Sequence, residues 1–402
     1  MIIYHAKIET KVGGCMRFAK RMDTFHASVF TELKEKKEEF TKRTGQKTID
    51  LSIGSPQILP DSSIMQVMRE AVSQPENYKY AINELDDLLL AIQNWYKKRY
   101  QVDLDKEEII CLQGSQEALC NLPMVLCDPG DVVLVPDPHY PIFVDGPHLA
   151  GAEVAFMPMK EENDYLIQFN EIDPELARRA KMMIVSYPNN PTCATAPDSF
   201  YEELIAFAKK YDILVIHDNA YSELVFDGKE GKSFLSFPGA KEIGVEVNSF
   251  SKTYGMAGAR LGVCVGNKDV IQHFRILKSN IDYGIFLPVQ YAGIEALCHG
   301  GSTIEETRAM YQAHRDILVG GLNRLGWKVK SSPATMFVWA KIPDSYSDSN
   351  AFVLDVLEKT GVVLTPGQSF GQAGIRYVRM ALVQDGPTLQ EAVNRFEKAH
   401  CF

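Results

Sequence analysis

Short apolar segments alternate with amphipathic segments over most of the chain, and this alternation predicts the architecture. From about residue 105 the apolar segments are rich in valine and isoleucine, and the segments between them have helical periodicity. Parallel strands that are buried on both faces of a sheet have this composition. The strand-like segments are EIICLQ, DVVLVPD, AEVAFMP, KMMIVSY, ILVIHD, EVNSF and LGVCVGN. The sequence therefore predicts an α/β domain with a mostly parallel sheet.

The C-terminal part of the chain has a different pattern and predicts a smaller α+β unit. We expect helices near 303–325, 350–360 and 388–399, around the strand-like segments WKVKSS, MFVWAKI, GVVLTPG and IRYVRMAL. An amphipathic helix over 28–44, with Phe30, Leu33 and Phe40 on its apolar stripe, is expected to pack with this unit. The predicted division is an N-terminal extension (1–27), a large domain (56–295) and a small domain (28–55 and 296–402).

Length and composition support two packed units and exclude several classes of protein. A chain of 402 residues exceeds what one hydrophobic core usually holds. A net charge of −10 argues against general nucleic-acid binding, which requires a basic face. We find no signal peptide, no membrane-spanning segment, and no CxxC or zinc-like spacing among the eight cysteines. These features predict a cytoplasmic protein with reduced thiols, no membrane partner and no metal site.

Polar side chains follow several of the predicted strands at the point where each strand ends. Asp218 ends ILVIHD, Lys252 follows EVNSF, and Asn190 follows KMMIVSY. Ser115 and Gln116 come after EIICLQ, at the start of a helix. In open α/β sheets ligands bind outside the carboxyl ends of the strands, so we expect these groups to lie together.

Taken singly, each of these residues has a simpler structural interpretation. A lysine after a strand is most often a solvated turn residue, and a strand-terminal aspartate commonly caps a helix or forms a turn. Asn-Asn-Pro is an ordinary turn signal. The order and spacing of the motifs distinguish a functional site from these alternatives.

The segment NSFSKTYGMAGARLG, preceded by YPNNPT and HDNAY, resembles the class I/II pyridoxal-phosphate-dependent aminotransferases of fold type I. The resemblance runs from about Asp50 to the C-terminus. HDNAYSELVFDG, FLSFPGAKEIG and LKSNIDYGIF are similar to the LL-diaminopimelate aminotransferase-like branch of that family. The resemblance implies pyridoxal 5'-phosphate as cofactor and a homodimer with shared active sites.

The resemblance also implies roles around the cofactor ring. Lys252 is expected to bond covalently to the cofactor and then to act as general base and acid, with a lowered pKa. Asp218 is expected to pair with the pyridine nitrogen. Asn190 and Tyr221 are expected to hydrogen-bond the phenolic oxygen, and Tyr140 to stack on the ring. From composition alone, a core tyrosine is an equally good interpretation of Tyr140.

Further roles concern the cofactor phosphate. The backbone N–H groups of Ser115 and Gln116 are expected to bind it at a helix N-terminus. Ser249, three residues before Lys252, and Arg260, eight residues after it, match phosphate ligands of the family. Tyr80 matches a tyrosine that reaches the phosphate from the partner subunit.

For the substrate α-carboxylate the resemblance implies Arg379 in YVRMAL and the backbone of Gly54 in LSIGSP, together with Asn190. Arg376 is the nearby competitor. Because it lies an odd number of residues from Arg379, it should face the other side of a strand.

The sequence departs from the family pattern at three positions. Cys193 stands where the family usually has the glycine of NPTG, which bears on that turn and removes no catalytic group. Leu85 and Leu90 replace the usual glycine and arginine after Tyr80, which affects substrate choice more than cofactor chemistry.

These observations predict an aminotransferase that moves an amino group from an L-amino acid to a 2-oxo acid by a ping-pong mechanism. Diaminopimelate, aspartate, alanine and aromatic amino acids are candidate donors. A C–S or β-lyase on the same fold is the alternative, since Lys252 and Asp218 serve both reactions. A cofactor-binding regulator would need a further DNA-binding domain, and a nicotinamide dehydrogenase would need an early GxGxxG, which is absent from the sequence.

Overall fold

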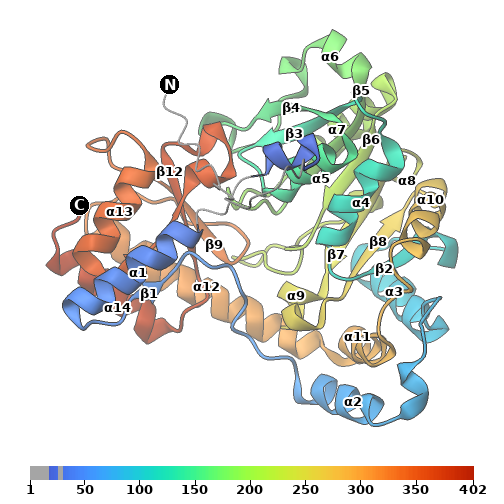
Figure 1. The fold of residues 1–402 in the computed structure, drawn as a ribbon, viewed down its shortest axis with the longest axis horizontal. Coiled ribbons are helices and arrows are strands. Elements are labelled where there is room, and N and C mark those ends of the chain that lie inside the picture. The colour runs from blue at the N-terminus through green and yellow to red at the C-terminus, as the bar shows by residue number, and fades with distance from the viewer. Residues whose placement is uncertain (1–17, 26–29) are drawn as a thin grey trace.

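The computed structural model describes residues 18–25 and 30–402, and a seven-stranded sheet forms its centre (Figure 1). The strand order is β2-β8-β7-β6-β5-β3-β4, and β8 alone in this sheet runs against its neighbours. The strands are β2 (Ile109–Leu112), β3 (Val132–Asp137), β4 (Glu153–Pro158), β5 (Ala180–Ser186), β6 (Leu214–Asp218), β7 (Gly244–Ser249) and β8 (Gly262–Gly266).

Helices cover both faces of this sheet, as its buried valine-rich strands require. One face packs against α4, α5 and α10, and the other packs against α3, α7 and α11. The helices of this unit are α2 (Ser62–Val72), α3 (Asp86–Tyr100), α4 (Gln116–Leu126), α5 (Ile142–Ala150), α6 (Pro174–Arg179), α7 (Asp198–Tyr211), α8 (Ala240–Ile243), α9 (Phe250–Thr253), α10 (Lys268–Ser279) and α11 (Leu287–His299).

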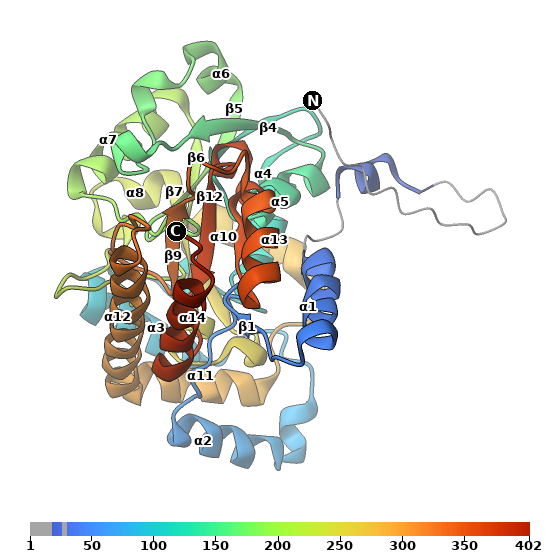
Figure 2. The same ribbon diagram turned by 90° about the vertical axis from the view of Figure 1, so that its left-hand side faces the viewer.

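A second, smaller unit carries its own hydrophobic core. Its antiparallel sheet has the order β11-β12-β9, and a parallel pair joins β1 to β10. These strands are β1 (Ile49–Asp50), β9 (Phe337–Lys341), β10 (Val362–Val363), β11 (Thr365–Pro366) and β12 (Tyr377–Ala381). The surrounding helices are α1 (Phe30–Thr44), α12 (Gly301–Arg324), α13 (Ser349–Thr360) and α14 (Gly386–Lys398), as the turned view in Figure 2 shows.

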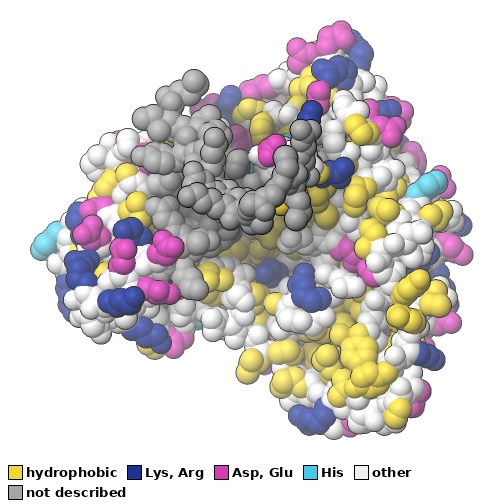
Figure 3. All heavy atoms as spheres, viewed as in Figure 1, with side chains coloured by type: hydrophobic (Ala, Val, Ile, Leu, Met, Phe, Trp, Pro, Cys, Tyr) yellow, Lys and Arg dark blue, Asp and Glu magenta, His cyan; other side chains and the backbone are white. Residues whose placement is uncertain are grey.

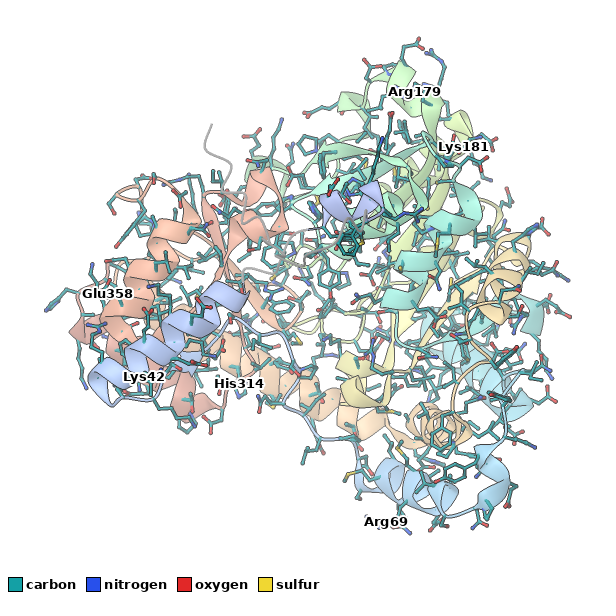
Figure 4. All side chains as sticks on the ribbon, in the orientation of Figure 1. Lys42, Arg69, Arg179, Lys181, His314 and Glu358 are labelled. Carbon is teal, nitrogen blue, oxygen red and sulfur yellow. The ribbon has the colours of Figure 1, made fainter. Side chains whose placement is uncertain are left out.

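The N-terminal helix α1 packs against α13 of the small unit. Arg43 of α1 donates a hydrogen bond to the carbonyl oxygen of Glu358 (3.2 Å). Figure 4 labels Lys42 and Glu358 on these two helices. Phe40 is buried beside Gly361, which ends α13 in a left-handed conformation (φ 70°). Residues from near both ends of the chain therefore contribute to the small unit.

One expected strand does not form. Residues 327–332 (WKVKSS) have no strand geometry, and the nearest strand, β9, begins at Phe337. A side chain pairs the backbone of one residue of this segment where a strand would have formed a ladder. Asn323 bonds both the N–H and the C=O of Val329, and the indole N–H of Trp327 donates to Lys341 O (2.7 Å). The apolar alternation of this segment reflects core packing rather than pairing.

The predicted fold class is confirmed, because the central sheet is mostly parallel and helices cover both of its faces. The exact domain limits remain a prediction. Of the expected extension 1–27, residues 1–17 and 26–27 lie outside the described residues, and the short helix Lys20–Thr24 contacts α5. Within the part of the chain that the structure describes, no helix has the length and apolar character needed to cross a membrane.

The junction between Phe40 and Gly361 can be tested with Gly361→Ala. A Cβ at this position would lie 2.4 Å from the Phe40 ring. The backbone φ of 70° at Gly361 is also strained for any residue with a side chain. We expect unfolding free energy in urea to fall by roughly 2–4 kcal/mol. Gly228→Ala is the matched control. Gly228 has φ 72°, and a Cβ added there would meet no atom of the described residues within 4 Å, so this variant should lose only about 1 kcal/mol of unfolding free energy. Equal losses would contradict the close packing of α1 on α13.

Candidate functional site

A cavity of about 530 Å³ lies between the carboxyl ends of the central strands and the small unit. This volume is within the usual range for small-molecule sites. Its wall combines cationic, carboxylate, amide and aromatic groups. The lining residues that the sequence had singled out are Gly54, Ser115, Gln116, Tyr140, Asn190, Asp218, Tyr221, Ser249, Lys252, Arg260 and Arg379.

Three neighbouring strands deliver the chemically active groups to this cavity. Asp218 is the last residue of β6, and Asn190 lies in the loop after β5. Lys252 lies in the short helix α9, which follows β7 without a linker. Because β5, β6 and β7 are parallel neighbours, their carboxyl ends meet at one edge and bring these three side chains together.

Asp218 is a buried carboxylate with few partners. Its Oδ1 accepts a hydrogen bond from the amide of Ala220 at 3.3 Å. Burial raises the pKa of Asp218 to about 6, and the neighbouring His217, the Ala220 amide and the positive charge of Lys252 oppose this rise. A carboxylate in this position favours a cationic partner in the cavity.

Burial also shifts the pKa of the Lys252 amine, but in the opposite direction. Burial, with the positive charges of Arg379 and Arg260, lowers the pKa of Lys252 to about 8, although Asp218 opposes the shift. Its Nζ donates a hydrogen bond to the carbonyl oxygen of Gly54 at 3.2 Å. A substantial fraction of the amine is therefore neutral near physiological pH, as a nucleophile or general base requires.

One end of the cavity is suited to an anion. Ser115 is the N-cap residue of α4, and Gln116 is the first residue of that helix. Arg260 is held beside them by hydrogen bonds to the carbonyl oxygens of Ala257 (3.0 Å) and Gln113 (3.3 Å). A guanidinium next to the N-terminus of an eleven-residue helix favours a phosphate-like group.

At the other end Arg379 is 5% exposed and lies between two aromatic rings. Its Cζ is 4.1 Å from the Phe337 ring centroid and 4.6 Å from that of Phe370. Its Nη1 donates to Asn190 Oδ1 (3.0 Å) and its Nη2 donates to Ser52 O (3.1 Å). Its Nε has no hydrogen-bond partner among the described residues. A buried guanidinium with a free N–H favours binding of a carboxylate.

Comparisons with known proteins agree with this geometry. A family model, aminotransferase class I and II, matches residues 46–396. The chain belongs to this family. It is 42% identical to the LL-diaminopimelate aminotransferase of Halothermothrix orenii over 386 residues, covering 96% of this chain and 99% of that protein. It is 43% identical to the enzyme of the same name from Moorella thermoacetica, with coverages of 95% and 98%.

Solved structures of aminotransferases share the whole fold. The substrate-bound structure of BacF from Bacillus subtilis superposes with a TM-score of 0.91 at 35% identity, covering 95% of this chain and 98% of that one. The fold is therefore that of the fold type I enzymes, and the expected family is confirmed. The chain is a pyridoxal-phosphate-dependent aminotransferase, and the lyase alternative is not supported.

The residues present fit pyridoxal 5'-phosphate. The cofactor has a phosphate, an aldehyde and a basic ring nitrogen, and the cavity offers a cationic helix N-terminus, the amine of Lys252 and the carboxylate of Asp218. Ring-facing groups are also present, since Tyr140 lines the cavity and its hydroxyl lies 3.3 Å from Gln116 Oε1. Among the described residues no group of three or more metal-binding side chains is found.

One predicted site residue lies elsewhere. Tyr80 does not line the cavity of its own chain, is 77% exposed and packs against Tyr283 on the surface. Arg376, the competitor of Arg379, points away and bonds the carbonyl oxygens of Tyr346 and Pro343. Arg376 lies in the turn before β12, which begins at Tyr377, so the expected alternation along a strand does not apply to it.

Sequence reasoning missed the aromatic walls of the carboxylate end. Phe337 in MFVWAKI and Phe370 in GQSF both have the local pattern of core residues. Their contact with Arg379 depends on the fold of the small unit, and no local signal marks it.

The departures from the family pattern are accommodated locally. Cys193 has φ 63°, the left-handed conformation that a glycine adopts easily, so the turn is kept. Its buried thiol contacts Thr335 Oγ1 (3.3 Å) and Phe337 O (3.2 Å) of the small unit. Leu85 donates its amide to Gln290, and Leu90 is half-exposed on α3.

The charge coupling between Lys252 and Arg379 predicts a pH effect. In cofactor-free protein, acylation of Lys252 followed by peptide mass spectrometry should rise with pH and reach half its maximum near pH 8. Because the Arg379 cation lowers the pKa of Lys252, Arg379→Leu should move this midpoint to higher pH. An unchanged midpoint in the variant would show that the two charges are not coupled.

Proposed function

We propose that this aminotransferase uses Lys252 and Asp218 for proton transfer and charge control, and Arg379 for the α-carboxylate shared by both substrates. The observation that carries this proposal is that Arg379, a buried guanidinium whose Nε is unpartnered among the described residues, lines the same cavity as Lys252. An L-amino acid and a 2-oxo acid share only this carboxylate and the adjacent carbon. One site that alternates between them, as ping-pong transfer requires, must recognise the carboxylate.

Each residue has a defined task in the proposed mechanism. When bound, pyridoxal 5'-phosphate withdraws electrons from the substrate Cα and so makes its proton acidic. The neutral Nζ of Lys252 accepts that proton and returns it. Asp218 would hold a proton on the ring nitrogen through its carboxylate, and Asn190 and Tyr221 would donate hydrogen bonds to the ring oxygen. Arg260, Ser249 and the start of α4 would hold the phosphate.

At the carboxylate end, Arg379 and the backbone of Gly54 orient the substrate. Asn190 accepts a hydrogen bond from Nη1 of Arg379, so the same amide contacts both the arginine and the cofactor region. A carboxylate bound bidentately to the guanidinium places the substrate Cα at a fixed distance from Lys252.

For the donor we propose LL-diaminopimelate, supported by the names of the relatives that are 42% and 43% identical over nearly the whole chain. A second candidate is an amino acid with an aromatic or apolar side chain. Three cations line the cavity in the described part of the chain (Lys252, Arg260 and Arg379), and each is already assigned to the cofactor or the α-carboxylate. The remaining wall includes Ile53, Phe337 and Phe370, which suits an apolar side chain.

We further propose that the enzyme works as a homodimer, with Tyr80 completing the phosphate site of the partner subunit. Figure 3 shows hydrophobic side chains gathered over the region of α2 and α11. The large exposed apolar residues of this region are Leu59, Met65, Tyr78, Tyr80, Ile82, Tyr283 and Phe286. Exposed apolar surface of this kind marks an interface. The cytoplasm remains the predicted location.

A panel of donors tests the proposed reaction. Purified enzyme with 2-oxoglutarate should convert LL-diaminopimelate faster than aspartate, alanine or phenylalanine, measured as glutamate formed. A higher kcat/KM with phenylalanine would select the second candidate. Release of ammonia without glutamate from every donor would overturn the proposed transfer.

Substitution of Arg379 should weaken both substrates. Arg379→Leu removes the charge that pairs with their common carboxylate, which costs on the order of 2–5 kcal/mol. We expect kcat/KM for amino acid and 2-oxo acid to fall together, with cofactor affinity near that of the wild type. Arg376→Leu is the control and should have little effect on either value. A large effect of the control variant instead would reverse the assignment of the two arginines.

Mixing of two inactive variants tests the shared site. If Tyr80 acts on the partner, a heterodimer of Tyr80→Ala and Lys252→Ala chains has one site with both defects and one site with neither. Activity should then reappear on mixing, approaching half of the wild-type value per heterodimer. Verified heterodimers that stay at the average of the parents would show that Tyr80 acts within its own subunit or has no role.

A further inference from the structure

The end of β3 is joined to a turn of the small unit that reaches the cavity. Asp137 is the last residue of β3, and the cavity-lining Tyr140 follows three residues later. The turn runs from Phe370 to Gly374 and includes the short helix η9 (Gln372–Gly374). Phe370 is the residue that packs against the guanidinium of Arg379.

Hydrogen bonds tie the two segments together. The amide of Ala373 donates to the Asp137 carboxylate, 3.3 Å from each oxygen. The amide of His139 donates to the carbonyl oxygen of Phe370 at 2.7 Å. Burial raises the pKa of Asp137, and the amides of Ala373 and Gln372 oppose that rise. The carboxylate therefore accepts from the backbone of the turn.

Asp137 supplies a cap that the turn lacks. The N-cap position of η9 is Gly371, which has no side chain to accept from the following amides. Gly371 has φ 115°, and a Cβ there would lie 2.0 Å from Asp137 Oδ1. The missing side chain leaves room for Asp137, so that a carboxylate from the other unit caps the turn.

We propose that Asp137 is a positioning residue for the substrate carboxylate. By capping η9, Asp137 holds Phe370 against Arg379. The bond from the His139 amide to the Phe370 carbonyl oxygen joins the same turn to the loop of Tyr140. This inference rests on the proposed function, in which Arg379 binds the α-carboxylate. The guanidinium lies between Phe337 and Phe370, so loss of the cap releases one of its two walls. Bidentate binding depends on the orientation of the guanidinium plane.

The test compares three variants of the holoenzyme. Asp137→Ala should raise KM for both the amino acid and the 2-oxo acid by about tenfold or more, with a smaller change in kcat, because a modest misplacement of a substrate-orienting group has effects of this size. Asp137→Asn should restore much of the affinity, since its amide oxygen still accepts from Ala373. The matched control is Asp173→Ala, which removes the cap of α6 away from the cavity and should leave both KM values unchanged.

Hydrogen exchange gives a readout that does not depend on turnover. In Asp137→Ala the peptide covering 367–374 and the peptide covering 138–141 should both exchange faster than in the wild type. In Asp173→Ala neither peptide should change.

A fourth variant tests the ring itself. Phe370→Leu leaves the cap in place and should raise KM as Asp137→Ala does.

Two results would overturn the proposal. One is a KM within twofold of wild type in Asp137→Ala. The other is a KM in Phe370→Leu that is unchanged from the wild type. Failure of the proposed function has a different signature, because the wild type would then form no glutamate or Arg379→Leu would leave KM unchanged. The exchange measurement decides in either case whether Asp137 holds the turn.

Discussion

A single buried positive charge organises the site. Arg379 is held away from water between two aromatic rings, and burial lowers its pKa to about 10, so the guanidinium is still charged at neutral pH. Asn190 and Ser52 satisfy part of its hydrogen-bonding capacity, and its Nε has no partner among the described residues. The same charge lowers the pKa of Lys252. The proposed carboxylate recognition and the lowered pKa of the Lys252 amine therefore depend on one electrostatic element.

The position of that charge depends on both ends of the chain. Arg379 lies on β12. The amide of Ala381, in the same strand, donates to the carbonyl oxygen of Leu51 at 2.7 Å, and Leu51 directly follows β1, which pairs with β10. Gly54 follows directly from this N-terminal segment and meets Lys252 of the large unit. The cavity is complete only when the small unit, built from both termini, packs against the strand ends of the central sheet.

Contacts across this junction come from residues whose local roles are unremarkable. Cys193 keeps a turn that glycine would form more easily, and its thiol contacts Phe337 O. Asp137 ends a strand and caps a turn of the other unit. The first contact reaches Phe337, and the second reaches the turn that follows Phe370. Both rings lie beside Arg379, so this end of the cavity is sensitive to how the two units are joined.

The sequence by itself determined the alternation of strands and helices, the family, and the groups at the strand ends, because these depend on local periodicity and short-range spacing. Only the tertiary structure decided that Phe337 and Phe370 enclose Arg379, that Asp137 caps Gln372–Gly374, and that Tyr80 lies outside its own cavity. It also decided that residues 327–332 form no strand, and there the Asn323 side chain pairs the backbone of Val329. These features arise from contacts between segments distant in sequence, or from the side-chain partners available in the folded chain. The apolar pattern of each segment records that it is buried, not which residue it meets.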